Sequence, residues 1–155
     1  MRSLKELELI KLFRDWSGEE MLELSPIKNS GSNRQYFRLR GSSKIAVGVI
    51  GEDAKENKAF LSFSAHFKKC GLNVPEVYAS DEIHGIYIVR DLGDVSLFDL
   101  LMDEKSSKFP SAEIENLYKR SLRELIRFQL HAGKNLDYSL CFPAPNLMSN
   151  PCNGI

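Results

Sequence analysis

The apolar residues of the chain fall into segments with helical spacing and segments with strand-like spacing. From Ser3 onward they recur every three or four positions, which predicts an amphipathic helix that Ser3 and Glu6 cap and Gly18 ends. The residues expected on its buried face are Leu4, Leu7, Ile10, Phe13 and Trp16.

Strand-like segments follow this helix and are separated by short polar turns. An alternating apolar run covers residues 22–27, a second strand follows the turn after residue 28, and a β-branched run covers residues 44–50. Two further short strands are predicted at residues 76–80 and 85–89. Because the strands within each group are joined by short turns, we expect them to pair in antiparallel fashion.

A second helix is predicted from residue 52 or 53 to about Cys70, between the two groups of strands. Its buried stripe is expected to consist of Phe60, Phe63 and Phe67. Glu56 lies on the same face one turn earlier, where a buried carboxylate requires a cation or a hydrogen-bond donor. The alternative is that Glu56 is solvated near the helix N-terminus and favoured only by the helix dipole. His66 is interpreted as a surface residue.

The last third of the chain reads as helical. A helix is predicted at about residues 95–103, a loop at 106–110 and a long helix from residue 111 to about 131. The apolar face of the long helix comprises Ile114, Leu117, Tyr118, Ser121, Leu122, Leu125 and Phe128. Residues 134–155 contain three prolines and show no clear period.

Composition excludes several classes of protein. Lys and Arg together number 21, as do Asp and Glu, so the net charge of zero argues against a general nucleic-acid or anionic-membrane binder. The three cysteines form no Cys-x-x-Cys pair, which argues against a disulfide framework or a zinc site. Without an apolar signal segment or a run of membrane-spanning length, we expect a cytoplasmic protein.

The turn at residues 29–34 is the first candidate for chemistry. Backbone N–H groups in such a polar turn can bind phosphate oxygens, and Arg34 adds a permanently charged guanidinium. The alternative is an ordinary hairpin turn with a solvated arginine, because a single glycine, Gly31, is a weak phosphate signal.

The order of the elements and four short motifs point to a family. The motifs lie at residues 31–38, 73–78, 91–94 (Asp-Leu-Gly-Asp) and 130–131. With them, the chain resembles the N-terminal part of the aminoglycoside phosphotransferase family over about residues 20–145. It is most similar to the sugar-kinase branch that includes the N-acetylmuramate/N-acetylglucosamine anomeric kinases.

The resemblance implies an α+β fold of the protein-kinase-like type. Residues 1–90 would form an ATP-binding small lobe, with a five-stranded antiparallel sheet and flanking helices. Residues 91–94 would be the hinge, and residues 95–145 the first helices of a truncated large lobe. Residues 146–155 would be an irregular tail.

The resemblance also implies a nucleotide site, with ATP and Mg²⁺ as cofactors of the full-length relative and tight binding of neither expected here. The nucleotide-binding residues would be Gly31, Ser32, Asn33, Arg34, Glu56, Val89, Arg90, Asp91 and Leu92. Glu56 resembles the helix glutamate that pairs with a lysine on the third strand. Gly48 stands where that lysine is expected, so either Arg34 or Arg38 supplies the cation, or nucleotide binds differently.

Catalytic residues of such a family lie in the large lobe, and this chain has no plausible set. After His131 there is no His-x-Asp and no Asp-x-Asp, so neither catalytic residues nor a metal site is assigned. Residues 146–155 can be back-translated so that a shifted frame encodes Phe-Asp-Val-Gln-Ser-Val-Gln-Trp-Asp, which resembles the continuation in relatives. The hypothesis is a frameshift near Asn146, which the downstream gene sequence would test.

Two classes of function remain at this point. The first is the nucleotide-binding part of an ATP-dependent phosphotransferase, with a sugar as the expected acceptor and no turnover expected from this polypeptide alone. The second is a non-catalytic binding module that uses the same lobe to dock a partner. Neither class is expected to bind nucleic acid or membrane, and the first is expected to self-associate through the exposed face of the 111–131 helix.

Overall fold

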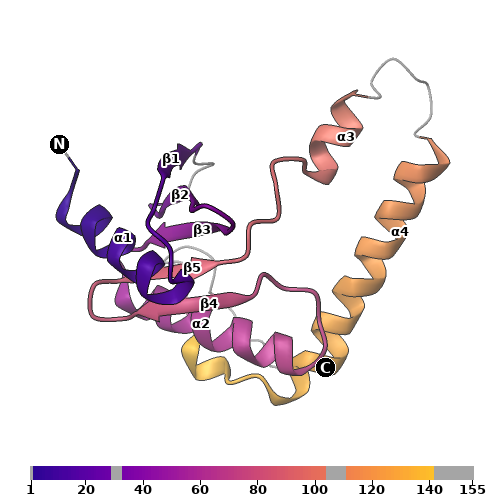
Figure 1. Ribbon diagram of the computed structural model, residues 1–155. Coiled ribbons are helices and arrows are strands. Elements are labelled where there is room, and N and C mark those ends of the chain that lie inside the picture. The colour runs from indigo at the N-terminus through magenta and orange to yellow at the C-terminus, as the bar shows by residue number, and fades with distance from the viewer. Residues whose placement is uncertain (1, 29–32, 104–110, 142–155) are drawn as a thin grey trace.

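The structure, a computed structural model, describes residues 2–28, 33–103 and 111–141. The helices in these ranges are α1 (Leu4–Ser17), α2 (Ala54–Lys69), α3 (Leu97–Asp103) and α4 (Ala112–Ile126) (Figure 1). The strands are β1 (Glu23–Ile27), β2 (Gln35–Arg40), β3 (Ile45–Ile50), β4 (Val77–Asp81) and β5 (Ile86–Val89). A π-helical segment, η1 (Arg127–Ala132), and two 3-10 turns, η2 (Gly133–Asn135) and η3 (Tyr138–Leu140), follow α4.

The five strands found in the described residues form one antiparallel sheet in the order β1-β2-β3-β5-β4. This confirms the predicted five-stranded antiparallel sheet, and the architecture is compatible with the small lobe of a kinase-like fold. β1 lies at one edge and contains Pro26, which pairs with Phe37 of β2. β4 lies at the opposite edge.

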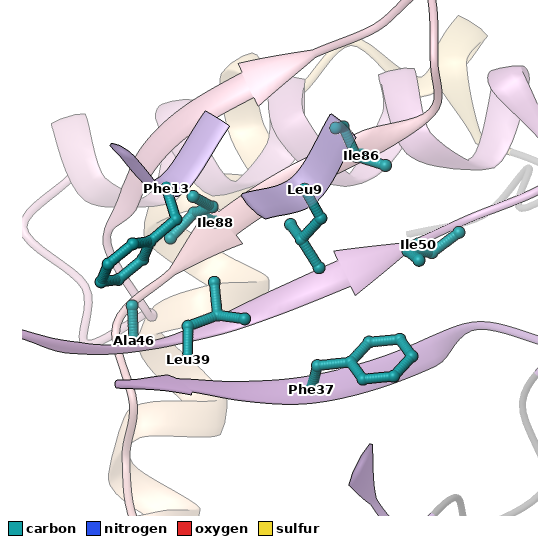
Figure 2. Close-up of a cluster of buried hydrophobic side chains, with 8 residues drawn as sticks. All are labelled: Leu9, Phe13, Phe37, Leu39, Ala46, Ile50, Ile86 and Ile88. Atoms are coloured by element: carbon teal, nitrogen blue, oxygen red, sulfur yellow. The ribbon is translucent and has the colours of Figure 1, made fainter. Parts of the chain in front are cut away.

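Helix α1 covers one face of the sheet, and its boundaries are those that the capping residues predict. Ser3 and Glu6 form a reciprocal capping box, and Gly18 ends the helix with a φ of 72°. Figure 2 shows the core beneath this helix. Its buried members are Leu9, Phe13, Phe37, Leu39, Ala46, Ile50, Ile86 and Ile88. Trp16 packs at the margin, where it stacks on Tyr78 with ring centroids 4.6 Å apart.

The predicted inward stripe of α1 is partly wrong. Leu9 and Phe13, one turn apart, are fully buried, whereas Leu4 and Leu7 are 73% and 51% exposed. Leu7 precedes Leu9 by two positions and therefore projects from the other side of the helix. The interpretation of Phe13 and Trp16 as core residues is confirmed.

Gly48 lies on the α1 face of the sheet, which corrects its assignment to the lysine position of a nucleotide site. A Cβ at Gly48 would lie 2.7 Å from Cδ2 of Leu9, so the absent side chain allows α1 to approach β3. On β3 the residues that pack in the core on the opposite face are Val47 and Val49. The face of β3 opposite α1 therefore carries valines, where a kinase-like fold would place a lysine.

Helix α2 covers that second face. Phe60 stacks on the buried Tyr87 with centroids 5.0 Å apart, and Leu61 also packs there. Phe63 and Phe67 are only half-buried, and Phe67 contacts Phe128 of η1 edge-to-face at 4.9 Å. The C-terminal half of α2 thus packs against η1 as well as lying beside β4.

His66 is not the lone surface residue that the sequence suggested. Its Nε2 lies 2.8 Å from the backbone oxygen of Ala132, and its ring is half-buried. Because a carbonyl oxygen only accepts, Nε2 carries the proton and donates. His66 therefore links α2 to the segment that follows α4.

Helix α4 leaves much of its apolar face exposed. Ile114 is buried, but Tyr118, Leu122 and Leu125 are 41%, 59% and 50% exposed. Among the described residues, no helix is both long and apolar enough to cross a membrane. The predicted loop at 106–110 and the tail at 146–155 lie outside the described residues.

Candidate functional site

The candidate site lies on the α2 face of the sheet, at β2. Arg34, Tyr36 and Arg38 alternate along this strand and the residue before it, so their side chains share one face. Tyr36 packs beside the core of this face, and Arg34 lies over the ring of Phe60, 5.3 Å from its centroid. The three side chains therefore lie on the side of the sheet that α2 covers.

Arg34 and Glu56 form an ion pair between the residue that precedes β2 and the first turn of α2. The Nη2 of Arg34 lies 3.1 Å from Oε1 of Glu56 and donates to the Glu56 backbone oxygen at 3.3 Å. The Arg34 side chain is 13% exposed and that of Glu56 46% exposed. Of the two candidate cations, Arg34 and Arg38, it is Arg34 that pairs with Glu56, and the Glu56 side chain is half in solvent.

The local sequence fixes the position of Glu56. Oδ1 of Asp53 accepts from the backbone N–H groups of Lys55 and Glu56 at 2.8 and 3.1 Å, so α2 starts at Ala54. Glu56 then lies in the first turn, where the helix dipole favours a carboxylate. Both interpretations of Glu56 therefore describe part of its environment.

On the side that faces the sheet, Arg34 lies beside an apolar environment that disfavours charged groups. Burial raises the pKa of the Tyr87 hydroxyl to about 12, while the charge of Arg34 acts in the opposite direction. A guanidinium beside such an apolar face needs a counter-charge, and Glu56 supplies it. The pair is thus held between an apolar core and solvent.

A pocket of about 450 Å³ opens beside this pair. Its lining residues are Asn33, Arg34, Glu52, Asp53 and Glu56. One guanidinium faces three carboxylates, so the described lining alone favours cations over phosphate. Gly31 and Ser32, predicted to bind phosphate through their backbone, lie outside the described residues.

Arg38 binds the polar segment that follows β5. Its Nε and Nη2 donate to Oδ2 and Oδ1 of Asp91 at 2.6 and 3.1 Å, and its Nη1 and Nη2 donate to the two oxygens of Asp94 at 2.9 and 2.8 Å. The hydrogen bonds from Arg38 hold the pKa of both aspartates below the usual range, and those carboxylates raise the pKa of Arg38. Arg38 is therefore committed to this segment and not to Glu56.

The remaining predicted nucleotide-binding residues lie at the end of β5 and directly after it. Val89 is 8% exposed and pairs with Val47 and Val77. Arg90 donates its backbone N–H to Glu76 O at 2.8 Å, which leaves it unavailable to a ligand. Leu92 is 69% exposed and is therefore accessible from solvent.

Sequence reasoning missed the role of Arg38 at the hinge. Arg38 and Asp91 are 53 positions apart, and their contact depends on β5 lying two strands from β2. The available signal was the strand alternation that placed Arg38 on the site face. In the described part of the chain, no group of three or more His, Cys, Asp or Glu side chains could hold a metal ion, so we derive no role for Mg²⁺ there.

Comparison with curated proteins finds two sugar kinases with weak similarity to the chain. The N-acetylmuramate/N-acetylglucosamine kinase of Pseudomonas aeruginosa is 26% identical over 115 residues, which are 74% of this chain and 32% of that protein. The enzyme of the same name from Pseudomonas putida is 24% identical over 125 residues, 79% of this chain and 34% of that protein. No protein-family model matches the chain. The chain thus spans about a third of the length of the curated relatives it matches.

Proposed function

We propose that this chain is the nucleotide-binding part of an ATP-dependent small-molecule phosphotransferase of the aminoglycoside phosphotransferase family, with a sugar as the acceptor class. The weak similarity to two sugar kinases supports a kinase-like phosphotransferase. In this proposal residues 1–90 form the small lobe, residues 91–94 the hinge and residues 95–145 the start of a large lobe.

The ion pair between Arg34 and Glu56 is the observation that carries the proposal. It joins the turn before β2 to the first turn of α2, on the sheet face away from α1. A cation tethered to a helix glutamate at this place can hold phosphate oxygens of a nucleotide. Arg34 would thus take the part of the strand lysine that β3 lacks.

Each of the other residues has a defined part in the proposal. The backbone of Gly31, Ser32 and Asn33 would meet the phosphates together with Arg34, and so offset the three carboxylates of the pocket. The backbone of Asp91 and Leu92 would meet the edge of the base, since the Arg90 N–H is occupied. Magnesium ligands and the group that orients the acceptor would come from a large lobe.

A non-catalytic docking module is the second candidate. Such a module should cover its own apolar surface, whereas Leu122, Leu125 and Leu130 of α4 and η1 are half or more exposed. The exposed face therefore favours a lobe that packs against further protein.

The test is binding of ATP and adenosine to the chain and to Arg34→Ala, measured by isothermal titration calorimetry. We expect Arg34→Ala to weaken ATP binding roughly ten- to hundredfold and adenosine binding little, because the guanidinium contacts phosphate and not base. Arg40→Ala is the matched control, since Arg40 lies on the same strand and its side chain is 46% exposed. Equal losses for the two ligands, or no ATP binding by the unaltered chain, would contradict the proposal.

A further inference from the structure

We propose that Arg38 is a positioning residue that fixes the hinge at residues 91–94 in the conformation that presents Asp91 and Leu92 to the nucleotide base. The identity of the ligand rests on the proposed function. The ordering of the hinge by Arg38 does not, and it can be tested without any ligand.

The guanidinium of Arg38 binds both hinge aspartates, Asp91 and Asp94, at once. Four N–H···O contacts run from one guanidinium to the four carboxylate oxygens of Asp91 and Asp94. The side chains of Arg38 and Asp91 are 16% and 15% exposed, so their pairing is shielded from solvent, while that of Asp94 is 73% exposed. Paired charges in this fork geometry are strong and directional, so they restrict the backbone that carries the aspartates.

The same contacts exclude a phosphate role for Arg38. The guanidinium carries one positive charge and the two aspartates carry two negative charges, so the cluster is formally negative. A phosphate would have to displace a carboxylate from Arg38 and would be repelled by the one released. Arg38 therefore acts on a nucleotide through the hinge and not by direct contact.

Two further hydrogen bonds complete the positioning of the hinge. Arg90 N–H donates to Glu76 O at 2.8 Å, and Gly93 N–H donates to Oδ1 of Asp91 at 2.8 Å. Gly93 has a φ of 82°, which turns the chain back so that Asp94 can reach Arg38. Asp91 and Leu92 thus lie between two backbone N–H groups, those of Arg90 and Gly93, that are held by hydrogen bonds.

Strand β2 connects this hinge to the proposed phosphate site. Arg34 and Arg38 are four residues apart, which in an extended strand corresponds to about 13 Å. One arginine pairs with α2 and the other with the hinge. β2 and the residue before it therefore set the spacing between the part that would meet phosphate and the part that would meet the base.

The first test is backbone hydrogen exchange in Arg38→Gln, without ligand. We expect exchange of the hydrogen-bonded Arg90 and Gly93 amides to rise at least about tenfold and exchange at β1 to stay unchanged, because the charged hydrogen bonds that restrain the hinge are lost. Arg40→Gln is the control, since Arg40 pairs with Glu23 at 3.6 Å and acts on Asp91 and Asp94 through its charge alone, whereas Arg38 binds them by hydrogen bonds. Hinge exchange within twofold of the unaltered chain would overturn the proposal.

A second variant distinguishes the loss of the contact between Arg38 and Asp91 from a general loss of stability. Asp91→Asn removes the charge of the shielded partner, and we expect it to raise hinge exchange as Arg38→Gln does. If the two substitutions act through one contact, the double variant should be no worse than the worse single variant. Additive increases would show that Arg38 and Asp91 act separately, which would also overturn the proposal.

The ligand test uses adenosine and inorganic tripolyphosphate. We expect Arg38→Gln to weaken adenosine binding roughly tenfold and to leave tripolyphosphate binding unchanged, which is the opposite of the pattern expected for Arg34→Ala. An equal loss for both ligands would overturn the positioning role. If the unaltered chain binds neither ligand, the proposed function fails, while the exchange experiment still decides whether Arg38 orders the hinge.

Discussion

The side chain of Leu9 fills the space that a Cβ at Gly48 would need. Cδ2 and Cδ1 of Leu9 lie 2.7 and 2.9 Å from that position, and Leu9 is fully buried. Helix α1 and strand β3 therefore meet through a glycine on one side and a leucine on the other.

Gly48→Ala is expected to destabilise the chain by about 1–3 kcal/mol, because the added methyl group must push Leu9 and α1 away from the sheet. Urea unfolding measures the change. In the Leu9→Val background the additional cost of Gly48→Ala should be smaller, since space has been released. The same cost in both backgrounds would contradict the direct contact.

Glu56→Gln should lower the free energy of unfolding by about 1 kcal/mol, because Arg34 loses its counter-charge in a partly buried pair. Urea unfolding at low and high salt is the measurement, and high salt should reduce the difference. Glu52→Gln serves as the control, since Glu52 lines the same pocket but is exposed. A silent Glu56→Gln would remove the kinase-like role of this glutamate.

Glu19 should contribute to the acid stability of the fold. The hydroxyl and N–H of Ser43, with the N–H of Lys44, donate to its carboxylate and lower its pKa from 4.5 to about 2. The pKa is lower in the folded state, so the stabilisation is present above about pH 4.5 and is lost as the pH falls towards 2.

Unfolding followed by circular dichroism between pH 5 and pH 2 tests this expectation. Glu19→Gln should make stability less dependent on pH in that window, and Ser43→Ala should do so to a smaller degree because it removes one donor. An unchanged pH dependence in both variants would show that the contact is not maintained in solution.

The exposed face of α4 should drive weak self-association. Leu122 is 59% exposed between Tyr118 and Leu125, and burying one leucine at an interface typically gives a tenfold or larger effect. We therefore expect Leu122→Lys to weaken self-association at least about tenfold in sedimentation velocity experiments.

The control for this experiment is Leu4→Lys. Leu4 is 73% exposed but lies on α1, on a different part of the molecule. It should leave self-association unchanged. A chain that stays monomeric at all concentrations would show that the α4 face does not associate with itself.

The strands and helix ends could be predicted from the sequence because their signals are local. Ser3, Gly18 and Asp53 each act within a few residues, and the polar turns separate the strands. The face of α1 that packs on the sheet could not be predicted, because a helix with several leucines offers more than one apolar stripe. The sheet selects Leu9 over Leu7.

The contacts of the candidate site could be predicted only where local sequence patterns determine them. A contact of Glu56 with Arg34 or Arg38 followed from the alternation of residues 34–38 and the helical spacing along α2, and the structure shows that the partner is Arg34. The side of the sheet on which Gly48 lies could not be predicted, because β3 is apolar on both faces and shows no alternation. The contact of Arg38 with Asp91 depends on strand order, which no local pattern contains.

Pro26 has a consequence for how copies of this chain can meet. It lies in β1, at an edge of the sheet, where an additional strand from another molecule could otherwise add to the ladder. Proline offers no N–H at that position, so strand addition along β1 would lack one hydrogen bond at Pro26. Association by strand addition is thereby disfavoured at this edge of the sheet.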